Sequence, residues 1–382
     1  MKTKNDKIVF VNQSSGYLMI DIVNIFKCKY KEAVLITGQL IKRNADLDGY
    51  AKIDTIIPYH RKNAISRLYS WILATLQVIF KLLFKYNKRY DLFLVTNPPF
   101  SMFIPLLFKR KYSLLIYDTY PDVLITHRII SSNSFISRYW RMANRKALKN
   151  ASNIYTVSEG MAECLSQYID RQRIKVIPNW SDTSFLKPLP KENNPFVLEH
   201  HLADKFIVLY SGNMGATHDI EAIVELATAM KNDRDVLFVL IGEGVKKTKI
   251  EALINEYELE NCLLLPYQKV EVLPFSLSCA NIGIVTLNRE SSLLSVPSKM
   301  YSLMAVGAVL LGIGSRHSEL GYMVKKYGIG DIFSRDAICE MRVFILNMKN
   351  NKTACLQYAS NSRKASFDFT RENALSYVNN YN

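Results

Sequence analysis

Short apolar runs alternate with longer segments of mixed character along the first half of the chain. Six of these runs are bounded by turn residues and have the length of strands: 7–12, 33–37, 91–96, 113–118, 153–158 and 174–179. Continuous apolar runs separated by amphipathic segments are typical of parallel strands that helices cover on both faces. The pattern therefore predicts one α/β, Rossmann-like domain over residues 1–180.

The same pattern starts again in the second half. Residues 181–204 are rich in proline and polar side chains, as expected of an interdomain linker. Five further apolar runs follow, at 206–212, 236–242, 262–266, 282–287 and 309–313. They predict a second Rossmann-like domain over 205–360, and residues 361–382 are expected to form a helix that crosses back to the first domain. Two such sheets facing each other would bind ligands in the cleft between them.

The net charge of +15 comes from the first half of the chain. Residues 1–190 contain 29 Lys and Arg against 13 Asp and Glu, whereas residues 191–382 contain 20 against 21. Such asymmetry indicates a polyanionic partner. An anionic membrane surface is favoured, and nucleic acid is not expected.

The segment 67–90 is a candidate for that membrane contact. It combines Trp71 and many Leu, Ile and Phe residues with Lys81, Lys85, Lys88 and Arg89. A basic amphipathic helix of this kind can lie in a membrane interface. The structural alternative is a helix that buries its apolar face on the sheet and only shows its lysines to water.

Two further features bear on the compartment. The N-terminus enters a strand without a signal-peptide core, and the six cysteines form no CxxC pair, which indicates a cytoplasmic location. The longest uncharged run in a helical pattern, 68–80, has 13 residues, fewer than the roughly 20 that span a bilayer. We therefore predict no transmembrane segment, and expect peripheral attachment to the inner face of the cytoplasmic membrane.

Two motifs in the second half suit an anionic ligand. In SGNMG (211–215), between a strand and a helical pattern, Gly212 and Gly215 let a ligand approach the backbone, and the helix N-terminus favours phosphate. The alternative is a tight turn that needs glycine for its own geometry. In VPSK (296–299), Pro and Ser suit a helix start and Lys299 can reach a phosphate, with Gly307 ending that helix.

These motifs, with VTNPPF (95–100), DTYPD (118–122), TVSEGM (156–161), VIPNWSD (176–182) and LIGEG (240–244), resemble glycosyltransferase family 4 over nearly the whole chain. The similarity is strongest to its bacterial capsule, O-antigen and exopolysaccharide branch. The resemblance implies a GT-B fold and a retaining hexosyltransferase that uses a UDP- or GDP-linked sugar. It implies a polyprenyl-diphosphate-linked saccharide as acceptor in surface polysaccharide biosynthesis. It implies no cofactor and no metal.

The resemblance also assigns donor-binding residues, motif by motif. Ser211, Gly212, Asn213 and Gly215 would lie by the diphosphate and the sugar, and Ser298 and Lys299 would bind phosphate oxygens. Gly242 and Glu243 would lie near the nucleotide, with Tyr267 near the base. Gly16 would sit across the cleft, where its small size leaves room for a substrate.

The chain departs from the family pattern at two places. The pair of glutamates found eight residues apart in many members is replaced by Leu294 and Ser302, of which Ser302 can still donate a hydrogen bond to the donor. The basic residue that often follows the SGN turn is also absent, since this segment holds Ala216 and His218. Lys299 is therefore expected to bear more of the diphosphate charge.

The candidate catalytic residues are the two carboxylates of DTYPD, Asp118 and Asp122, directly after an apolar run. Either can orient an acceptor hydroxyl or stabilise positive charge on an oxocarbenium-like sugar. In the structural alternative, Asp118 caps the turn and Asp122 caps the next helix. The pair Asp46 and Asp48 matches a DxD metal motif only superficially, since it lies in a polar loop, and we expect no metal there.

Two other functions remain open at this stage. A nucleotide-sugar epimerase of the same fold would turn over the donor without an acceptor. A non-catalytic sugar- or lipid-binding partner of a polysaccharide assembly complex would bind a donor without turnover, and the absent glutamates are compatible with it.

Overall fold

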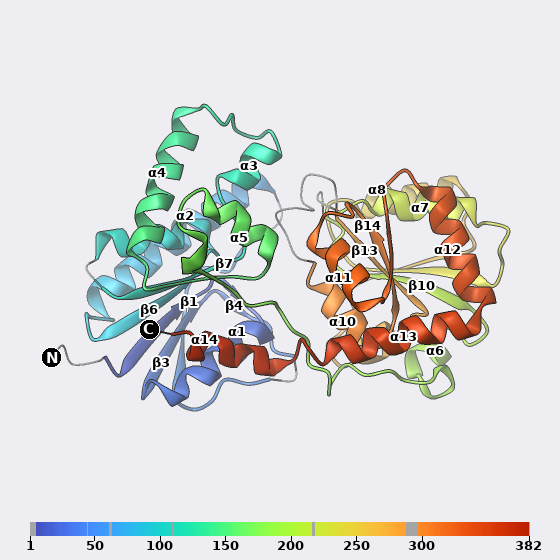
Figure 1. Ribbon diagram of the computed structural model, residues 1–382, viewed down its shortest axis with the longest axis horizontal. Helices are drawn as coiled ribbons and strands as arrows, with labels where there is room; N and C mark the ends of the chain where they lie inside the picture. The colour runs from blue at the N-terminus through green and yellow to red at the C-terminus, as the bar shows by residue number, and fades with distance from the viewer. Residues whose placement is uncertain are drawn as a thin grey trace. The chain divides into compact units, whose positions relative to one another are not determined.

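The protein folds into two compact units, Met1–Asn179 with Arg371–Asn382 (unit 1), and Trp180–Thr370 (unit 2). The computed structural model describes residues 5–43, 45–60, 63–108, 110–215, 218–287 and 297–381. Each unit consists of a parallel sheet with helices on both faces (Figure 1). The prediction of two Rossmann-like α/β domains is confirmed.

The sheet of unit 1 has seven parallel strands in the order β5-β3-β1-β6-β7-β8-β9. Their bounds are β1 (Lys7–Val11), β3 (Glu32–Thr37), β5 (Ala51–Thr55), β6 (Tyr90–Val95), β7 (Tyr112–Ile116), β8 (Asn153–Thr156) and β9 (Ile174–Val176). In register, Lys7 of the central strand β1 pairs with Glu32 and with Tyr90. A separate two-residue pair joins β2 (Ser14–Ser15) and β4 (Gln39–Leu40).

Helices α1 (Tyr17–Ile25) and α14 (Leu375–Asn379) lie on one face of this sheet, and α2 (Ala64–Phe84), α4 (Phe135–Asn150) and α5 (Glu159–Ser166) lie on the other (Figure 1). The shorter helices are η1 (Phe26–Cys28), η2 (Pro99–Leu107), α3 (Asp122–Thr126), η3 (Arg171–Arg173) and η5 (Arg371–Ala374). Aromatic contacts hold the C-terminal residues in unit 1. The Tyr381 ring centroid lies 5.0 Å from that of Phe26, and the Tyr377 ring 4.9 Å from that of Tyr155.

The sheet of unit 2 has six parallel strands in the order β12-β11-β10-β13-β14-β15. They are β10 (Phe206–Ser211), β11 (Val236–Ile241), β12 (Cys262–Leu265), β13 (Ile282–Thr286), β14 (Val309–Ile313) and β15 (Gly330–Phe333). The helices are α6 (Pro195–Glu199), α7 (Ile220–Ala229), α8 (Lys247–Glu256), α9 (Leu273–Ser278), α10 (Lys299–Ala305), α11 (Glu319–Tyr327), α12 (Ile338–Asn350) and α13 (Lys352–Ser366), preceded by η4 (Lys191–Asn193). Helix α12 packs on α7, and α13 packs on α10 and α11.

The stretch 181–204 is folded onto unit 2. Asn194 accepts hydrogen bonds from the first amides of α6 through its side chain, and α6 buries Phe196 and Val197. This helix packs against α9. The proline-rich segment therefore contributes to the packing of unit 2.

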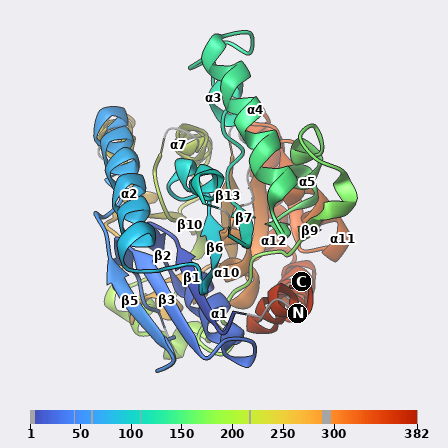
Figure 2. The ribbon, with the colours of Figure 1, turned by 90° about the vertical axis from the view of Figure 1, so that its left-hand side faces the viewer.

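Helix α2 has two apolar faces. Its inner face packs into unit 1 at a spacing of four residues, through Ser70, Ala74, Val78 and Leu82. Large apolar side chains on the opposite face are 46% to 82% exposed and form what we call the apolar stripe of α2: Ile65, Leu68, Tyr69, Ile72, Leu76, Phe80, Leu83 and Phe84. Figure 2 shows α2 at the outer edge of unit 1.

This helix corrects one prediction. The helix continues through Arg67 and Lys81, so the apolar segment is longer than the uncharged run 68–80. In length and composition Ile65–Phe84 suffices to cross a membrane, and it is the single such helix in the part of the chain that the structure describes. Its inner face is nevertheless part of unit 1, and Asp54 of β5 forms ion pairs with both Lys81 and Lys85.

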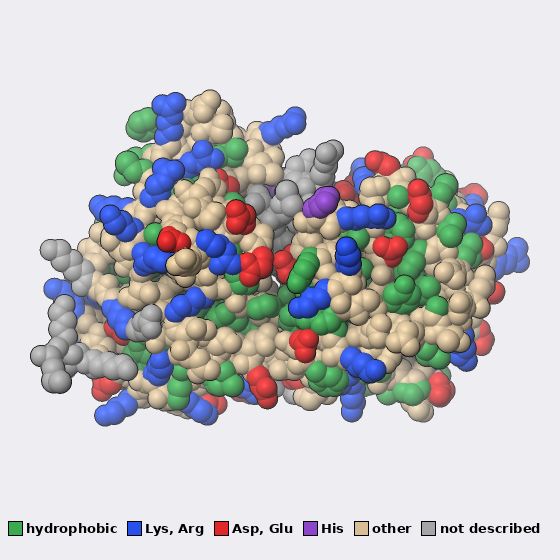
Figure 3. Space-filling model, in the orientation of Figure 1, with side chains coloured by type: hydrophobic (Ala, Val, Ile, Leu, Met, Phe, Trp, Pro, Cys, Tyr) green, Lys and Arg blue, Asp and Glu red, His purple; other side chains and the backbone are tan. Residues whose placement is uncertain are grey.

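Helix α4 combines positive charge with exposed apolar side chains. It contains five Arg and Lys and no Asp or Glu. Phe135, Ile136, Tyr139 and Met142 on the same helix are 58% to 84% exposed. Hydrophobic and basic side chains accordingly lie together over the part of unit 1 that carries α4 (Figure 3).

Candidate functional site

The turns after β10 and β11 in unit 2 pack backbone to backbone. Gly212 N–H donates to Ile241 O at 2.8 Å, and Met214 N–H donates to Glu243 O at 2.8 Å. A Cβ on Gly242 would lie 2.0 Å from Gly212 O, so this approach requires glycine. The structure thus brings SGNMG and LIGEG together at the carboxyl edge of the sheet, where ligands bind in open parallel sheets.

Lys299, the first residue of α10, lies directly on Gly212. A Cβ on Gly212 would be only 2.1 Å from Lys299 Cε. The ammonium donates to the Tyr210 hydroxyl at 2.5 Å and lies 4.1 Å from the centre of the Tyr210 ring. The two motifs predicted to bind phosphate therefore meet, with Tyr210 as a residue that the sequence did not indicate.

The electrostatics of this position suit an anion. Within the described ranges, Lys299 has no carboxylate partner, and burial lowers its pKa to about 7. Burial and the charges of Lys299 and Lys246 lower the pKa of His218 to about 3, so this imidazole is neutral at neutral pH. A half-buried ammonium without a counter-ion is stabilised when a phosphate oxygen approaches it.

The other residues of unit 2 that were predicted to bind the nucleotide-sugar donor differ in their surroundings. Glu243 forms an ion pair with Lys247 at 2.6 Å. Asn213, Tyr267 and Ser298 are exposed, and Ser298 is the N-cap residue of α10. Ser302 is buried, and its hydroxyl lies 3.5 Å from that of Ser181, which directs it into unit 2. The departures noted at Ala216 and Leu294 lie outside the described residues.

In unit 1, Gly16 is the N-cap residue of α1. A Cβ at this position would meet only Ile41 O, at 4.0 Å, so the packing of unit 1 does not require glycine here. The open space beside Gly16 is compatible with the predicted role of leaving room for a substrate.

Asp118 follows β7 at the carboxyl edge of the sheet of unit 1. Thr96 directly follows the neighbouring strand β6. Its Oγ1 accepts hydrogen bonds from the backbone amides of Tyr117, at 3.0 Å, and Asp118, at 3.4 Å. Asp118 is exposed as a residue, and its carboxylate has no hydrogen-bond or ion-pair partner among the residues described. The surrounding protein still desolvates this carboxylate and raises the pKa of Asp118 to about 6.

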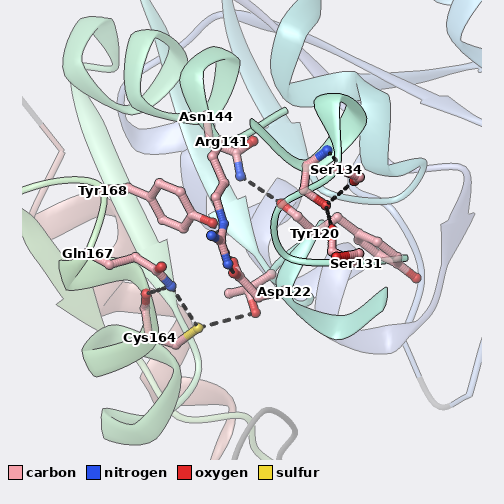
Figure 4. A network of polar contacts seen from close by, with 11 residues as sticks. Tyr120, Asp122, Ser131, Ser134, Arg141, Asn144, Cys164, Gln167 and Tyr168 are labelled. Atoms are coloured by element: carbon pink, nitrogen blue, oxygen red, sulfur yellow. Dashed lines mark hydrogen bonds and ion pairs between the residues drawn. The ribbon is translucent and has the colours of Figure 1, made fainter. Parts of the chain in front are cut away.

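Asp122 has different surroundings (Figure 4). Its carboxylate accepts a hydrogen bond from the Tyr168 hydroxyl at 2.6 Å and pairs with Arg141 of α4 at 3.3 Å. It is the first residue of α3 and does not cap that helix, whose N-cap residue is Pro121. Of the two predicted catalytic candidates, Asp118 is therefore available to a substrate and Asp122 ties three segments of unit 1 together.

Tyr120, between the two carboxylates, was also not singled out by the sequence. Its ring stacks on Trp140 of α4 at 6.0 Å between centroids and meets Trp71 of α2 edge-on at 5.8 Å. Asn144 of α4 donates to the Tyr120 carbonyl at 2.7 Å. In the sequence, the tryptophans at positions 71 and 140 were the signal that could have pointed to this aromatic cluster around Tyr120.

Comparison with known proteins agrees with these features. Residues 40–185 match the model of Glycosyltransferase Family 4. The putative colanic acid biosynthesis glycosyl transferase WcaI of Escherichia coli K12 is 26% identical over 186 residues, which cover 48% of this chain and 46% of that protein. The probable glycosyltransferase WbjE of Pseudomonas aeruginosa is 27% identical over 245 residues, 62% of this chain and 60% of that protein. The matches thus span about half the length of these curated relatives.

Solved structures agree over the whole chain. Alr3699/HepE from Anabaena, in complex with UDP and glucose, has a TM-score of 0.72 at 13% identity and covers 98% of both chains. WaaG, a glycosyltransferase involved in lipopolysaccharide biosynthesis, has a TM-score of 0.69 at 9% identity, covering 98% of this chain and 99% of its own. The fold is therefore the two-domain GT-B fold. Residues 40–185 match the family model and the curated relatives are named as glycosyltransferases, which supports the resemblance of the motifs to glycosyltransferase family 4.

Proposed function

We propose that this chain is a retaining glycosyltransferase that moves a sugar from a UDP- or GDP-linked donor to a lipid-linked saccharide in bacterial surface polysaccharide biosynthesis. The observation that carries the proposal is the contact between Lys299 and Gly212, which forms an anion site at the carboxyl edge of the sheet of unit 2. The names of similar proteins support the substrate classes. Alr3699/HepE was solved with UDP and glucose, and WcaI is named for colanic acid biosynthesis.

In this proposal, Lys299 and the amides of the SGNMG turn bind the donor diphosphate. As the bond between the sugar and the diphosphate breaks, negative charge builds up on the leaving phosphate, and a nearby ammonium stabilises it. Glu243 and Tyr267 lie on the following turns and would contact the nucleoside. The resemblance implies no metal and no cofactor, and the nucleotide sugar is a substrate.

The Asp118 carboxylate of unit 1 supplies the negative charge that the reaction needs. A sugar that loses its leaving group acquires positive charge, which a carboxylate stabilises, and a carboxylate can also orient the acceptor hydroxyl. Asp118 suits both tasks because no described residue pairs with it. We assign Asp122 a positioning role, since Arg141 and Tyr168 hold its carboxylate.

We further propose that the protein attaches peripherally to the inner face of the cytoplasmic membrane through α2. The apolar stripe of α2 is exposed along the whole helix, and exposed apolar surface of this extent marks an interaction site. The opposite face of the helix belongs to unit 1, so α2 would lie along the membrane surface. This arrangement would keep the enzyme beside a lipid-linked acceptor.

The test is a transfer assay with a panel of UDP- and GDP-sugars and lipid-linked saccharides, with wild type and Lys299→Met in parallel. We expect acceptor-dependent release of the nucleoside diphosphate, UDP or GDP, by wild type and strongly reduced release by Lys299→Met. The anomeric configuration of the product, read by NMR, checks retention. Conversion of the donor to an isomer without acceptor would identify an epimerase instead. Donor binding without turnover on any acceptor would identify a binding protein.

A further inference from the structure

Unit 1 contains an apolar groove between η2 and α4. Its volume is about 800 Å³, within the range of sites that hold one small ligand. Phe100, Phe103 and Leu107 of η2 line one side, and Ile136, Tyr139 and Trp140 of α4 line the other. Leu107, Ile136 and Tyr139 are 60% to 66% exposed, so the groove presents apolar side chains to the exterior.

The charge around this groove suits an anionic ligand. Lys146 of α4 is itself part of the lining. Arg138, Arg145 and Lys149 on the same helix are exposed, and α4 has no acidic residue. A ligand with a hydrocarbon chain and a phosphate group would match both the apolar lining and the basic rim.

The groove is connected to the candidate catalytic turn by aromatic contacts. Within the groove, the Phe100 ring lies 5.4 Å from that of Trp140. Trp140 in turn stacks on Tyr120, which lies between Asp118 and Asp122 in the DTYPD turn. A ligand bound in the groove would therefore contact the aromatic cluster that includes Tyr120 of the DTYPD turn, within one unit of the protein.

We propose that this groove binds the isoprenoid chain of the lipid-linked acceptor, with Lys146 beside the lipid phosphate. This inference rests on the proposed function, because it assigns a site to the acceptor of that reaction. The concave shape of the groove favours a single isoprenoid chain, rather than the bilayer surface, as its occupant. A single hydrocarbon chain can fill a groove of this volume, whereas the convex apolar stripe of α2 suits the bilayer surface. Two apolar surfaces of unit 1 would then have separate roles.

The test uses farnesyl phosphate below its micelle concentration as a probe, with inorganic phosphate as the comparison. Calorimetry should detect binding of farnesyl phosphate to wild type and at least tenfold weaker binding of inorganic phosphate. Leu107→Ser and Ile136→Asp should each weaken farnesyl phosphate binding at least tenfold, since each removes an apolar contact from the groove. Lys146→Gln should weaken it severalfold. Because these side chains are exposed, the melting temperatures should stay close to that of wild type.

The matched control is Val343→Ser with Leu356→Ser in unit 2, which changes exposed apolar side chains outside the groove and should leave farnesyl phosphate binding unchanged. Equal loss in this control and in the groove variants would place the chain elsewhere and overturn the inference. Unchanged binding in the groove variants, or no binding by wild type, would overturn it as well. If wild type fails to bind the probe yet transfers sugar to a lipid acceptor, the groove is wrong and the proposed function stands. Binding of farnesyl phosphate in the groove without any sugar transfer to a lipid acceptor would contradict only the proposed function.

Discussion

The side chain of Lys299 occupies the space that a Cβ on Gly212 would need, with Cε 2.1 Å from that position. The glycine of the SGN turn and the lysine of the PSK sequence are thus coupled by direct packing. The φ of Gly212, +148°, is also in a region that other residues rarely adopt. Both properties predict that substitution of the glycine disturbs the lysine.

We first predict that Gly212→Ala weakens binding of UDP at least tenfold. The methyl group displaces the Lys299 ammonium, and the backbone strain costs roughly 1–3 kcal/mol. Calorimetric titration with UDP measures the affinity, and thermal unfolding measures the strain. Gly49→Ala is the control, because a Cβ at Gly49 meets nothing within 4 Å. Wild-type affinity in Gly212→Ala would separate the turn from the donor site.

The second prediction concerns the protonation of Lys299. With its pKa lowered to about 7 by burial, about half of the amine is neutral at pH 7, and a bound diphosphate raises the pKa again. Binding of UDP at pH 7 should therefore take up roughly half a proton, and the affinity should fall as the pH rises above 7. Titrations in buffers of different ionisation enthalpy measure the uptake.

Lys299→Met serves as the reference for that experiment, since it retains the nucleotide's own titration and removes the amine. It should lower the affinity for UDP by about 1.5–3 kcal/mol, the range for hydrogen bonds to charged groups. Lys352→Met, at an exposed position on α13, should bind UDP like wild type. Equal proton uptake by Lys299→Met and wild type would assign the uptake to a group other than Lys299.

The third prediction is that Asp118→Asn lowers turnover at least tenfold, about 1.4 kcal/mol in the barrier, while UDP binding is retained. The charged form of Asp118 is the active one in our proposal, and desolvation raises its pKa to about 6. The wild-type rate should therefore fall as the pH drops through about 6. Steady-state rates between pH 5 and 8 test both points. A near-normal rate in Asp118→Asn would move catalysis to other residues.

The fourth prediction is that Asp122→Asn acts mainly on stability. The neutral amide loses the charge-assisted contacts to Arg141 and Tyr168, and the expected cost is about 1–3 kcal/mol in the free energy of unfolding. Chemical denaturation compares this variant with Asp118→Asn, which should be at least as stable as wild type, because desolvation makes the charged form of Asp118 unfavourable in the folded state. Turnover corrected for the folded fraction should change less in Asp122→Asn than in Asp118→Asn. The reverse order would exchange the roles of the two carboxylates.

The sequence predicted the buried strands of both sheets. It predicted neither the edge strands nor the side chains that pair with the candidate catalytic residues. All eleven apolar runs form strands, because strands covered on both faces are apolar throughout. The edge strands β5 and β15 were missed, and β5 reads AKIDT with a mostly exposed pattern. The roles of Asp118 and Asp122 look alike in the sequence, because Arg141 and Tyr168, which distinguish them, are brought near only by the fold.

The basic residues near α2 also needed the structure for their interpretation. Burial alone would raise the pKa of Asp54, but hydrogen bonds from Lys81, Tyr86 and Lys85 outweigh it and lower the pKa to about 2. Lys81 and Lys85 therefore hold the helix against β5. Replacing them would disturb the fold, so they are poor probes of membrane binding.

The last prediction uses the residues of α2 and its flank that are free of this pairing. Ile72→Ser with Leu76→Ser should weaken sedimentation with vesicles at least tenfold, since both side chains leave the apolar stripe. Lys88→Gln with Arg89→Gln removes two exposed charges beyond the end of α2. This pair should lose up to about 2 kcal/mol of binding on anionic vesicles at low salt, and much less on neutral vesicles or at high salt.

Both double variants should remain folded, because the changed side chains are exposed, and circular dichroism confirms this before sedimentation. Val343→Ser on α12 with Leu356→Ser on α13 of unit 2 is the matched control, since it removes two exposed apolar side chains from other helices without changing α2. Its vesicle binding should equal that of wild type once its folding is verified. Equal sedimentation of wild type and the α2 variants would show that the stripe faces something other than lipid. If only Lys88→Gln with Arg89→Gln binds vesicles more weakly, electrostatic attraction and not the apolar stripe attaches the protein to the membrane.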